Sequence, residues 1–288
     1  MPYVHLEATP TQPPLCIRYE ATGEPNAPHT LVCIHELGGA LDTYQELARR
    51  LAPTCRVIAF DQRGAGLSEH PIAAFTLGDL VADIERLVRK LEITTPFHLM
   101  GLAMGAVTAV TYATLHSDRL RSLILCDGTG EILPAASRYI KDRANMVRQM
   151  GMRAVVDESF MNSFKGILDA NTDPRWQAYR CRFLSNSPMS YAMHSDALAE
   201  AHLDDASLQS IACPTLVMTG VDDFIWPPKI GRRLAERIPG ATFRILEGAA
   251  HFPPVQAPDA VVQEVEALFA SIDRCSESGT SAVRDQLA

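Results

Sequence analysis

A histidine and an aspartate stand late in the sequence, in an order that suits proton transfer to and from a nucleophile. His251 follows the apolar run ATFRILE (residues 241–247), and Asp223 follows the apolar run TLVMTG (residues 215–220), so each comes just after a predicted buried strand. One ring nitrogen of a histidine can take a proton while a carboxylate holds the other nitrogen. The pattern therefore predicts general-base chemistry in which Asp223 orients His251, with Asp222 as the less favoured neighbour.

The position where a nucleophile would be expected is occupied by alanine. Residues 97–108 read FHLMGLAMGAVT: an apolar run ends at Gly101, Gly105 follows, and a helix of small residues begins. This layout is typical of a sharp strand-to-helix turn with a nucleophile at its centre. Here the centre is Ala103, whose methyl group cannot attack a carbonyl carbon.

Strands and helices alternate along most of the chain, from residue 30 to residue 272. The helix predicted at residues 77–91 is amphipathic. Near-continuous apolar strands in such an alternation predict an α/β fold with a mostly parallel sheet covered on both faces. The clearest predicted strands are residues 30–36, 56–62, 97–102, 122–128, 215–220 and 241–247.

The alternation breaks between residues 129 and 206. This segment is helical by composition and holds no convincing strand. It also contains six of the ten methionines. We expect it to form a helical cap over the carboxyl edge of the sheet. The predicted boundaries are residues 1–128 and 207–272 for the core, 129–206 for the cap and 273–288 for a flexible polar tail.

Five motifs together resemble the α/β-hydrolase superfamily, over roughly residues 15–272. In chain order they are HELGG, DQRGAGLS, GLAMGA, GVDD-x-x-x-P-P and GAAH-x-x-x-x-Q-x-P. Within the superfamily, the chain looks most like the 3-oxoadipate enol-lactonase and small esterase group. The resemblance implies an eight-stranded, mostly parallel sheet with helices on both faces and an inserted helical cap.

The resemblance also implies a role for individual residues. Ala103 occupies the nucleophile position, where serine is expected, Asp223 the position of the acid and His251 that of the general base. The backbone N–H groups of Leu37 and Met104 would form the oxyanion hole, which stabilises the negative charge of the transition state.

One residue departs from this pattern, because Glu36 stands where glycine or serine commonly follows the loop histidine. Its carboxylate could lie at the rim of the pocket.

Three hypotheses account for Ala103. In the first, the chain is an inactivated, substrate-trapping variant of a serine-type hydrolase that cleaves a small-molecule carboxylic ester or lactone. In the second, it is a non-catalytic ligand-binding protein on a hydrolase fold. In the third, His251 activates water or abstracts a substrate proton without a covalent step. We favour the first, because every other part of the catalytic set stands in its expected place.

The reaction itself is left open by the sequence. Hydrolysis of a carbon–carbon bond in a ring-cleavage product would use the same machinery, as would hydrolysis of an amide or thioester.

Composition argues against several other functions. The net charge of -8 over 288 residues disfavours nucleic-acid binding, because most of the surface would repel phosphate groups. The seven cysteines are scattered without C-x-x-C spacing, which indicates reduced thiols rather than a zinc site. GLAMGA lacks the G-x-G-x-x-G spacing of a dinucleotide site. We therefore expect no cofactor and no metal.

The expected partner is a small-molecule substrate. The N-terminal segment lacks the pattern of a secretory signal, and no apolar run reaches about 18 residues, so we expect a cytoplasmic protein without a membrane partner. Residues 131–182 hold nine Lys or Arg against six Asp or Glu. A positive cap would favour a substrate that carries a carboxylate, although solvated helix faces would explain the same count. The choice between monomer and homo-oligomer stays open.

Overall fold

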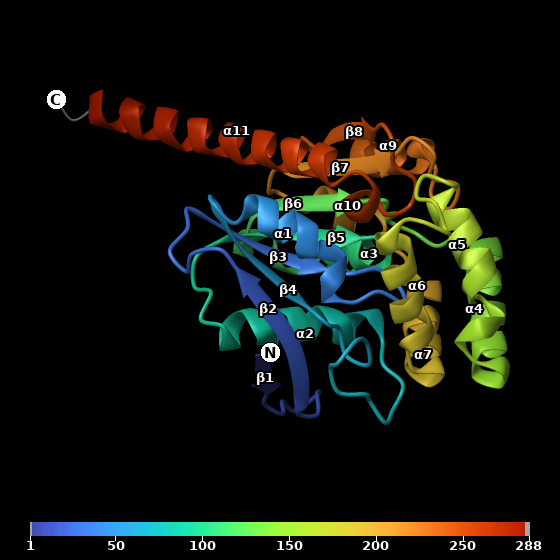
Figure 1. Cartoon of the computed structure of the whole chain (residues 1–288). Coiled ribbons are helices and arrows are strands. Elements are labelled where there is room, and N and C mark those ends of the chain that lie inside the picture. The colour runs from blue at the N-terminus through green and yellow to red at the C-terminus, as the bar shows by residue number, and fades with distance from the viewer. Residues whose placement is uncertain (1, 286–288) are drawn as a thin grey trace.

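A sheet of eight strands runs through the centre of the molecule (Figure 1). The computed structural model describes residues 2–285, with side chains up to residue 275. The strands lie in the order β1-β2-β4-β3-β5-β6-β7-β8. Their bounds are Tyr3–Leu6 (β1), Leu15–Thr22 (β2), His29–Ile34 (β3), Cys55–Phe60 (β4), Phe97–Leu102 (β5), Leu120–Cys126 (β6), Thr215–Gly220 (β7) and Thr242–Leu246 (β8).

The six strands from β4 to β8 in this order are parallel, and they are the six that the apolar runs predict. Strands β1 and β2 add an antiparallel edge. The predicted α/β fold with an eight-stranded, mostly parallel sheet is therefore confirmed. Because the six strands are parallel, their carboxyl ends meet at one edge of the sheet.

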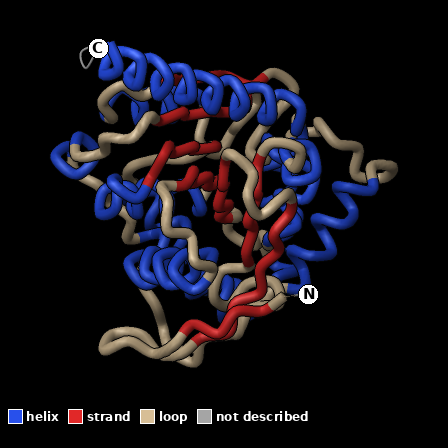
Figure 2. The backbone as a smooth tube through the Cα atoms, turned by 90° about the vertical axis from the view of Figure 1, so that its left-hand side faces the viewer, coloured by secondary structure: helices blue, strands red, loops and turns tan. Residues whose placement is uncertain are grey.

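Helices cover both faces of the sheet (Figure 2). Successive residues of a strand point to opposite faces, so Leu31 and Cys33 of β3 pack in one core layer and Val32 and Ile34 in the other. The first layer is completed by α1 and α11, the second by α2, α3, α8 and α9. The bounds are Gln45–Leu51 (α1), Leu77–Lys90 (α2), Met104–His116 (α3), Asp205–Gln209 (α8), Pro228–Arg237 (α9), Pro253–Gln256 (α10) and Pro258–Asp285 (α11).

Four of the helices between β6 and β7 lie wholly within the range predicted for the cap. They are α4 (Pro134–Met150), α5 (Val156–Phe164), α6 (Pro174–Ser185) and α7 (Pro188–Ala199). In Figure 1 they stand together at one end of the sheet. A single β-bridge between Glu131 and His202 joins the two ends of the insertion. Aromatic rings of α5 and α6 pack on one another and on Phe252 of the core.

The C-terminal segment differs from the sequence-based expectation. Residues 273–285, predicted to belong to a flexible polar tail, continue α11 as a helix to Asp285. No proline interrupts this stretch, so the backbone can extend the preceding amphipathic helix. Residues 286–288 of the predicted tail lie outside the described part. Within residues 2–285, no helix is both long enough and apolar enough to cross a bilayer.

Candidate active site

The turn between β5 and α3 has the strained geometry of a nucleophile elbow. Ala103 adopts φ 52° and ψ −115°, a conformation that non-glycine residues rarely take. Its N–H donates to the carbonyl of Cys126 at 2.9 Å, and its own carbonyl accepts the N–H of Ala106 at 2.9 Å. A Cβ at Gly101 would lie 2.1 Å from the carbonyl oxygen of Gly105, so strand and helix approach closely only with glycine there. The elbow is therefore intact although its centre has no hydroxyl group.

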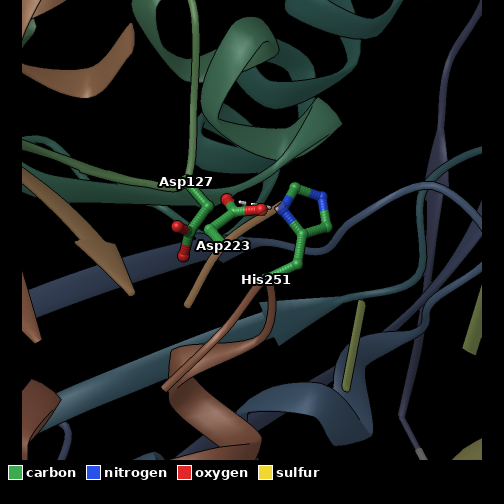
Figure 3. Close-up of side chains that lie close together, drawn as sticks. All are labelled: Asp127, Asp223 and His251. Carbon is green, nitrogen blue, oxygen red and sulfur yellow. Dashed lines mark hydrogen bonds and ion pairs between the residues drawn. The ribbon is translucent and has the colours of Figure 1, made fainter. Parts of the chain in front are cut away.

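Asp223 and His251 form a hydrogen-bonded pair at the same edge of the sheet (Figure 3). His251 Nδ1 lies 2.9 Å from Asp223 Oδ2, and both side chains are buried. The other carboxylate oxygen accepts the N–H groups of Ile225 at 2.8 Å and Trp226 at 3.1 Å. Asp222 makes no such contact, because its side chain is exposed. The structure thus joins the favoured aspartate to the predicted histidine.

The electrostatics of Asp223 suit a group that orients a histidine. Burial on its own would raise the pKa of this carboxyl group, but the neighbouring His251, through its charge and its hydrogen bond, and the Trp226 N–H hold the pKa below its ordinary value. Asp223 therefore stays anionic and can hold a proton on His251 Nδ1, which leaves Nε2 as the nitrogen that exchanges protons.

Asp127 is a third ionisable group in this cluster, and the sequence reading missed it. It follows β6, is fully buried, has φ 44°, and accepts the N–H of Gly220 at 3.0 Å through Oδ1. Burial raises the pKa of its carboxyl group well above the ordinary value, and Asp223 raises it further. The rule that chemistry gathers at the carboxyl ends of parallel strands could have found this residue.

The three side chains also have the spacing of a metal site. Within the part of the chain whose side chains are described, Asp127, Asp223 and His251 are the group whose ligand atoms all lie within 4.8 Å of one another. A metal there would have to replace the hydrogen bond from His251 to Asp223. We therefore interpret Asp223 and His251 as a proton-transfer pair, with Asp127 beside them.

A cavity of about 470 Å³ separates this edge of the sheet from the cap. Ala103 and His251 both line it, so the elbow and the histidine face the same space. Much of the lining is apolar, but the cap contributes a polar wall. Arg143 is the single Lys or Arg among the described lining residues, and it is paired with Glu158 and donates to Tyr139 Oη at 3.3 Å.

The two predicted oxyanion donors also line the cavity. Leu37 lies in the loop after β3, and Met104 is the first residue of α3. Among the described residues, neither backbone N–H finds a hydrogen-bond acceptor. Both are thus free to bind a substrate oxygen, and their role as an oxyanion hole stays a prediction.

A family model for the alpha/beta hydrolase fold matches residues 29–258. The chain belongs to the alpha/beta hydrolase fold family. It is 27% identical over 269 residues to 3-oxoadipate enol-lactonase 2 of Acinetobacter baylyi, covering 93% of this chain and 98% of that one. This agrees with the resemblance seen in the sequence.

Solved structures agree with this assignment. A thermophilic esterase from Thermogutta terrifontis superposes on this hydrolase-fold chain with a TM-score of 0.87 at 26% identity, covering 94% of this chain and 99% of the esterase. The enol-lactonase from Burkholderia xenovorans gives 0.84 at 28% identity, covering 93% and 100%.

Glu36, the residue that departs from the pattern of the hydrolase family, is held between the core and the cap. It lines the cavity, but its side chain is buried beneath α6. Its Oε1 accepts hydrogen bonds from Thr43 Oγ1 at 2.9 Å, from Tyr179 and from Arg182 at 3.2 Å. Burial raises the pKa of the Tyr179 hydroxyl, and the nearby Glu36 raises it further, so Tyr179 stays a donor. Glu36 therefore ties the loop of the predicted oxyanion donor Leu37 to the cap.

Proposed function

We propose that this fold catalyses hydrolysis of a small-molecule carboxylic ester or lactone when serine occupies position 103, and that the chain with Ala103 binds this substrate without consuming it. The observation that carries the proposal is the Asp223–His251 pair, whose histidine lines the same cavity as an intact nucleophile elbow. The esterase and lactonase relatives support the same class of substrate.

The reaction would follow the serine–histidine–aspartate scheme. A hydroxyl at position 103 attacks the substrate carbonyl while His251 takes its proton, and Asp223 stabilises the imidazolium that results. The N–H groups of Leu37 and Met104 hold the oxyanion. His251 then returns the proton to the leaving group, and water releases the acyl group. With a methyl group at position 103, the first bond cannot form, so substrate binding is the only step left.

The substrate of this proposal is a small molecule that carries a carboxylate. Arg143, in the cavity wall, is the group that could bind this carboxylate. The substrate carboxylate would replace Glu158, the half-exposed ion-pair partner of Arg143. The Thermogutta esterase was solved with malate bound, which is a dicarboxylate. Monoesters of dicarboxylic acids should therefore bind more tightly than neutral esters of equal size.

The experiment that tests the proposal is Ala103→Ser, assayed beside the parent chain on p-nitrophenyl esters, enol-lactones and simple lactones. Loss of a triad serine typically costs about 10⁶-fold in kcat, or about 8 kcal/mol of transition-state stabilisation, so a gain of thousands-fold or more is expected. Ala103→Gly is the matched control, because it changes the same position without adding a nucleophile.

Each outcome decides between functions. A gain with serine and none with glycine supports the hydrolase, and the best substrate names its class. A folded Ala103→Ser variant without activity on any ester or lactone would contradict it. Turnover of vinylogous 1,5-diketones would then indicate carbon–carbon bond hydrolysis, and tight ligand binding without turnover would indicate a binding protein.

A further inference from the structure

We infer that Asp127 carries a proton at neutral pH and donates it in a hydrogen bond to Asp223, so that Asp127 is a positioning residue for the Asp223–His251 pair. The positioning role rests on the proposed function, whereas the protonation state does not. Figure 3 shows the Asp127 carboxyl group beside that of Asp223, on the side away from the histidine ring.

The two carboxyl groups differ in the hydrogen-bond donors that surround them. Asp223 receives two backbone N–H groups and His251 Nδ1, which together satisfy both of its oxygens. Asp127 receives one N–H, from Gly220, on Oδ1. Its Oδ2 is buried and has no donor among the described residues. A carboxylate oxygen left without a donor in the interior is costly.

The two buried acids also lie close together. Oxygen atoms of Asp127 and Asp223 lie within 4.8 Å of each other, and both residues are buried. Two adjacent buried carboxyl groups do not both ionise, and the one with fewer donors keeps the proton. That residue is Asp127, and its proton turns the orphan Oδ2 into a donor towards Asp223. The other ionisable groups that face Asp127 are His251 and the buried thiol of Cys126.

The arrangement has a consequence for the site. A donated hydrogen bond fixes the plane of the Asp223 carboxylate without adding a second negative charge beside His251. Asp127 is itself held by its N–H, which donates to the carbonyl of Met218 at 2.9 Å. Its positive φ is one that aspartate and asparagine tolerate better than most residues. Asp127→Asn should therefore keep the backbone and still offer a donor, whereas Asp127→Ala removes it.

The protonation state can be tested on the chain as it is, with Ala103 in place. An infrared difference spectrum between the parent and Asp127→Asn at pH 7 should show the loss of one protonated-carboxyl band. Loss of carboxylate bands instead would overturn the inference. Asp61→Asn is the matched control, because Asp61 is also fully buried but accepts the N–H groups of Leu41 and Leu67 and pairs with Arg18. This control should lose carboxylate bands only.

The positioning role is tested by two further readouts. In the Ala103 chain, the NMR signal of the proton on His251 Nδ1 should persist in Asp127→Asn and shift or broaden in Asp127→Ala. In the Ala103→Ser background, Asp127→Asn should stay within a few-fold of the parent kcat. Asp127→Ala should lose kcat by about 10-fold or more at nearly unchanged KM, as expected for a misplaced catalytic group.

Contrary results are equally clear. Equal kcat and an unchanged Nδ1 proton signal in folded Asp127→Ala would overturn the positioning role. If Ala103→Ser is inactive, the proposed function fails, while the infrared and NMR results still decide this inference.

Discussion

Replacing Glu36 by glutamine should destabilise the chain by about 2–3 kcal/mol. The Glu36 side chain is 1% exposed and Arg182 of α6 13% exposed, with Nη2 to Oε1 at 3.2 Å. At an effective dielectric constant of about 20, two charges at this distance attract by about 5 kcal/mol. Breaking such a buried pair typically costs 3–5 kcal/mol, because one charge is left behind.

The structure explains why the expected loss of about 2–3 kcal/mol lies at or below the lower limit of this range. Arg182 also pairs with Asp42, so Glu36→Gln does not leave it without a counter-charge. Thr43 and Tyr179 can still donate to the amide oxygen of the new side chain. What is lost is the charge that draws α6 towards the loop of Leu37, one of the two predicted oxyanion donors.

The assay is guanidinium chloride unfolding of four proteins: the parent, Glu36→Gln, Arg182→Met and the double variant. Arg182→Met leaves Glu36 as a buried charge and should cost about 3–5 kcal/mol. The double variant should be more stable than the sum of the two single losses predicts, by about 1–3 kcal/mol of coupling energy. A Glu36→Gln variant as stable as the parent, with coupling below about 0.5 kcal/mol, would refute the reasoning.

Three further predictions concern the elbow, a buried histidine and the acid. Gly101→Ala should unfold the chain or cost several kcal/mol, because the new Cβ would lie 2.1 Å from a backbone oxygen. The control is Gly78→Ala, whose Cβ would have its nearest contact at 3.5 Å. It should cost under about 0.5 kcal/mol in the same chemical unfolding assay. Burial, with His29 and Arg121 nearby, lowers the pKa of His98 to about 2. Below pH 6.5 only the unfolded chain then binds this proton, so the free energy of unfolding should decrease as the pH is lowered, by up to about 1.4 kcal/mol per pH unit. His98→Gln should flatten this slope between about pH 6.5 and 5. Because the pKa of Asp223 is lowered in the folded chain, its carboxylate contributes stability. That contribution is complete at pH values above the ordinary pKa of 3.8 and is lost as the pH falls through the lower pKa of the folded chain. The stability gap between the parent and Asp223→Asn should therefore close in acid, and a gap that does not depend on pH would contradict the assignment.

Much of the fold could be predicted from the sequence because its signals are local. The six parallel strands are short, mostly apolar runs, and β3, β5 and β7 are buried at nearly every position, so few polar residues interrupt the pattern. Strand β2 carries alternating and partly exposed residues, LCIRYEAT, and was not assigned from its sequence. Antiparallel edge strands depend on pairing with a neighbour, which periodicity alone does not reveal.

The site divides in the same way. Asp223 and His251 were predicted because chain order and loop spacing constrain them. Arg143 and the contacts of Glu36 were not predicted, because they depend on how the cap helices pack over the sheet. Cap packing is a tertiary property that no motif encodes. Asp127 lies between these cases, since its position at a strand end was visible but its proximity to Asp223 was not.

The geometry of the elbow supports the proposal that Ala103 stands in a hydrolase that lacks only the hydroxyl group of its nucleophile. A residue other than glycine at φ 52° costs about 1–2 kcal/mol. The close approach of β5 to α3 at Gly101 and Gly105 enforces this conformation, so it does not depend on the side chain at position 103. A protein that only binds its ligand gains nothing from this strain or from a histidine held by a buried aspartate. A nucleophile uses both, which is why Ala103→Ser is the change expected to restore catalysis.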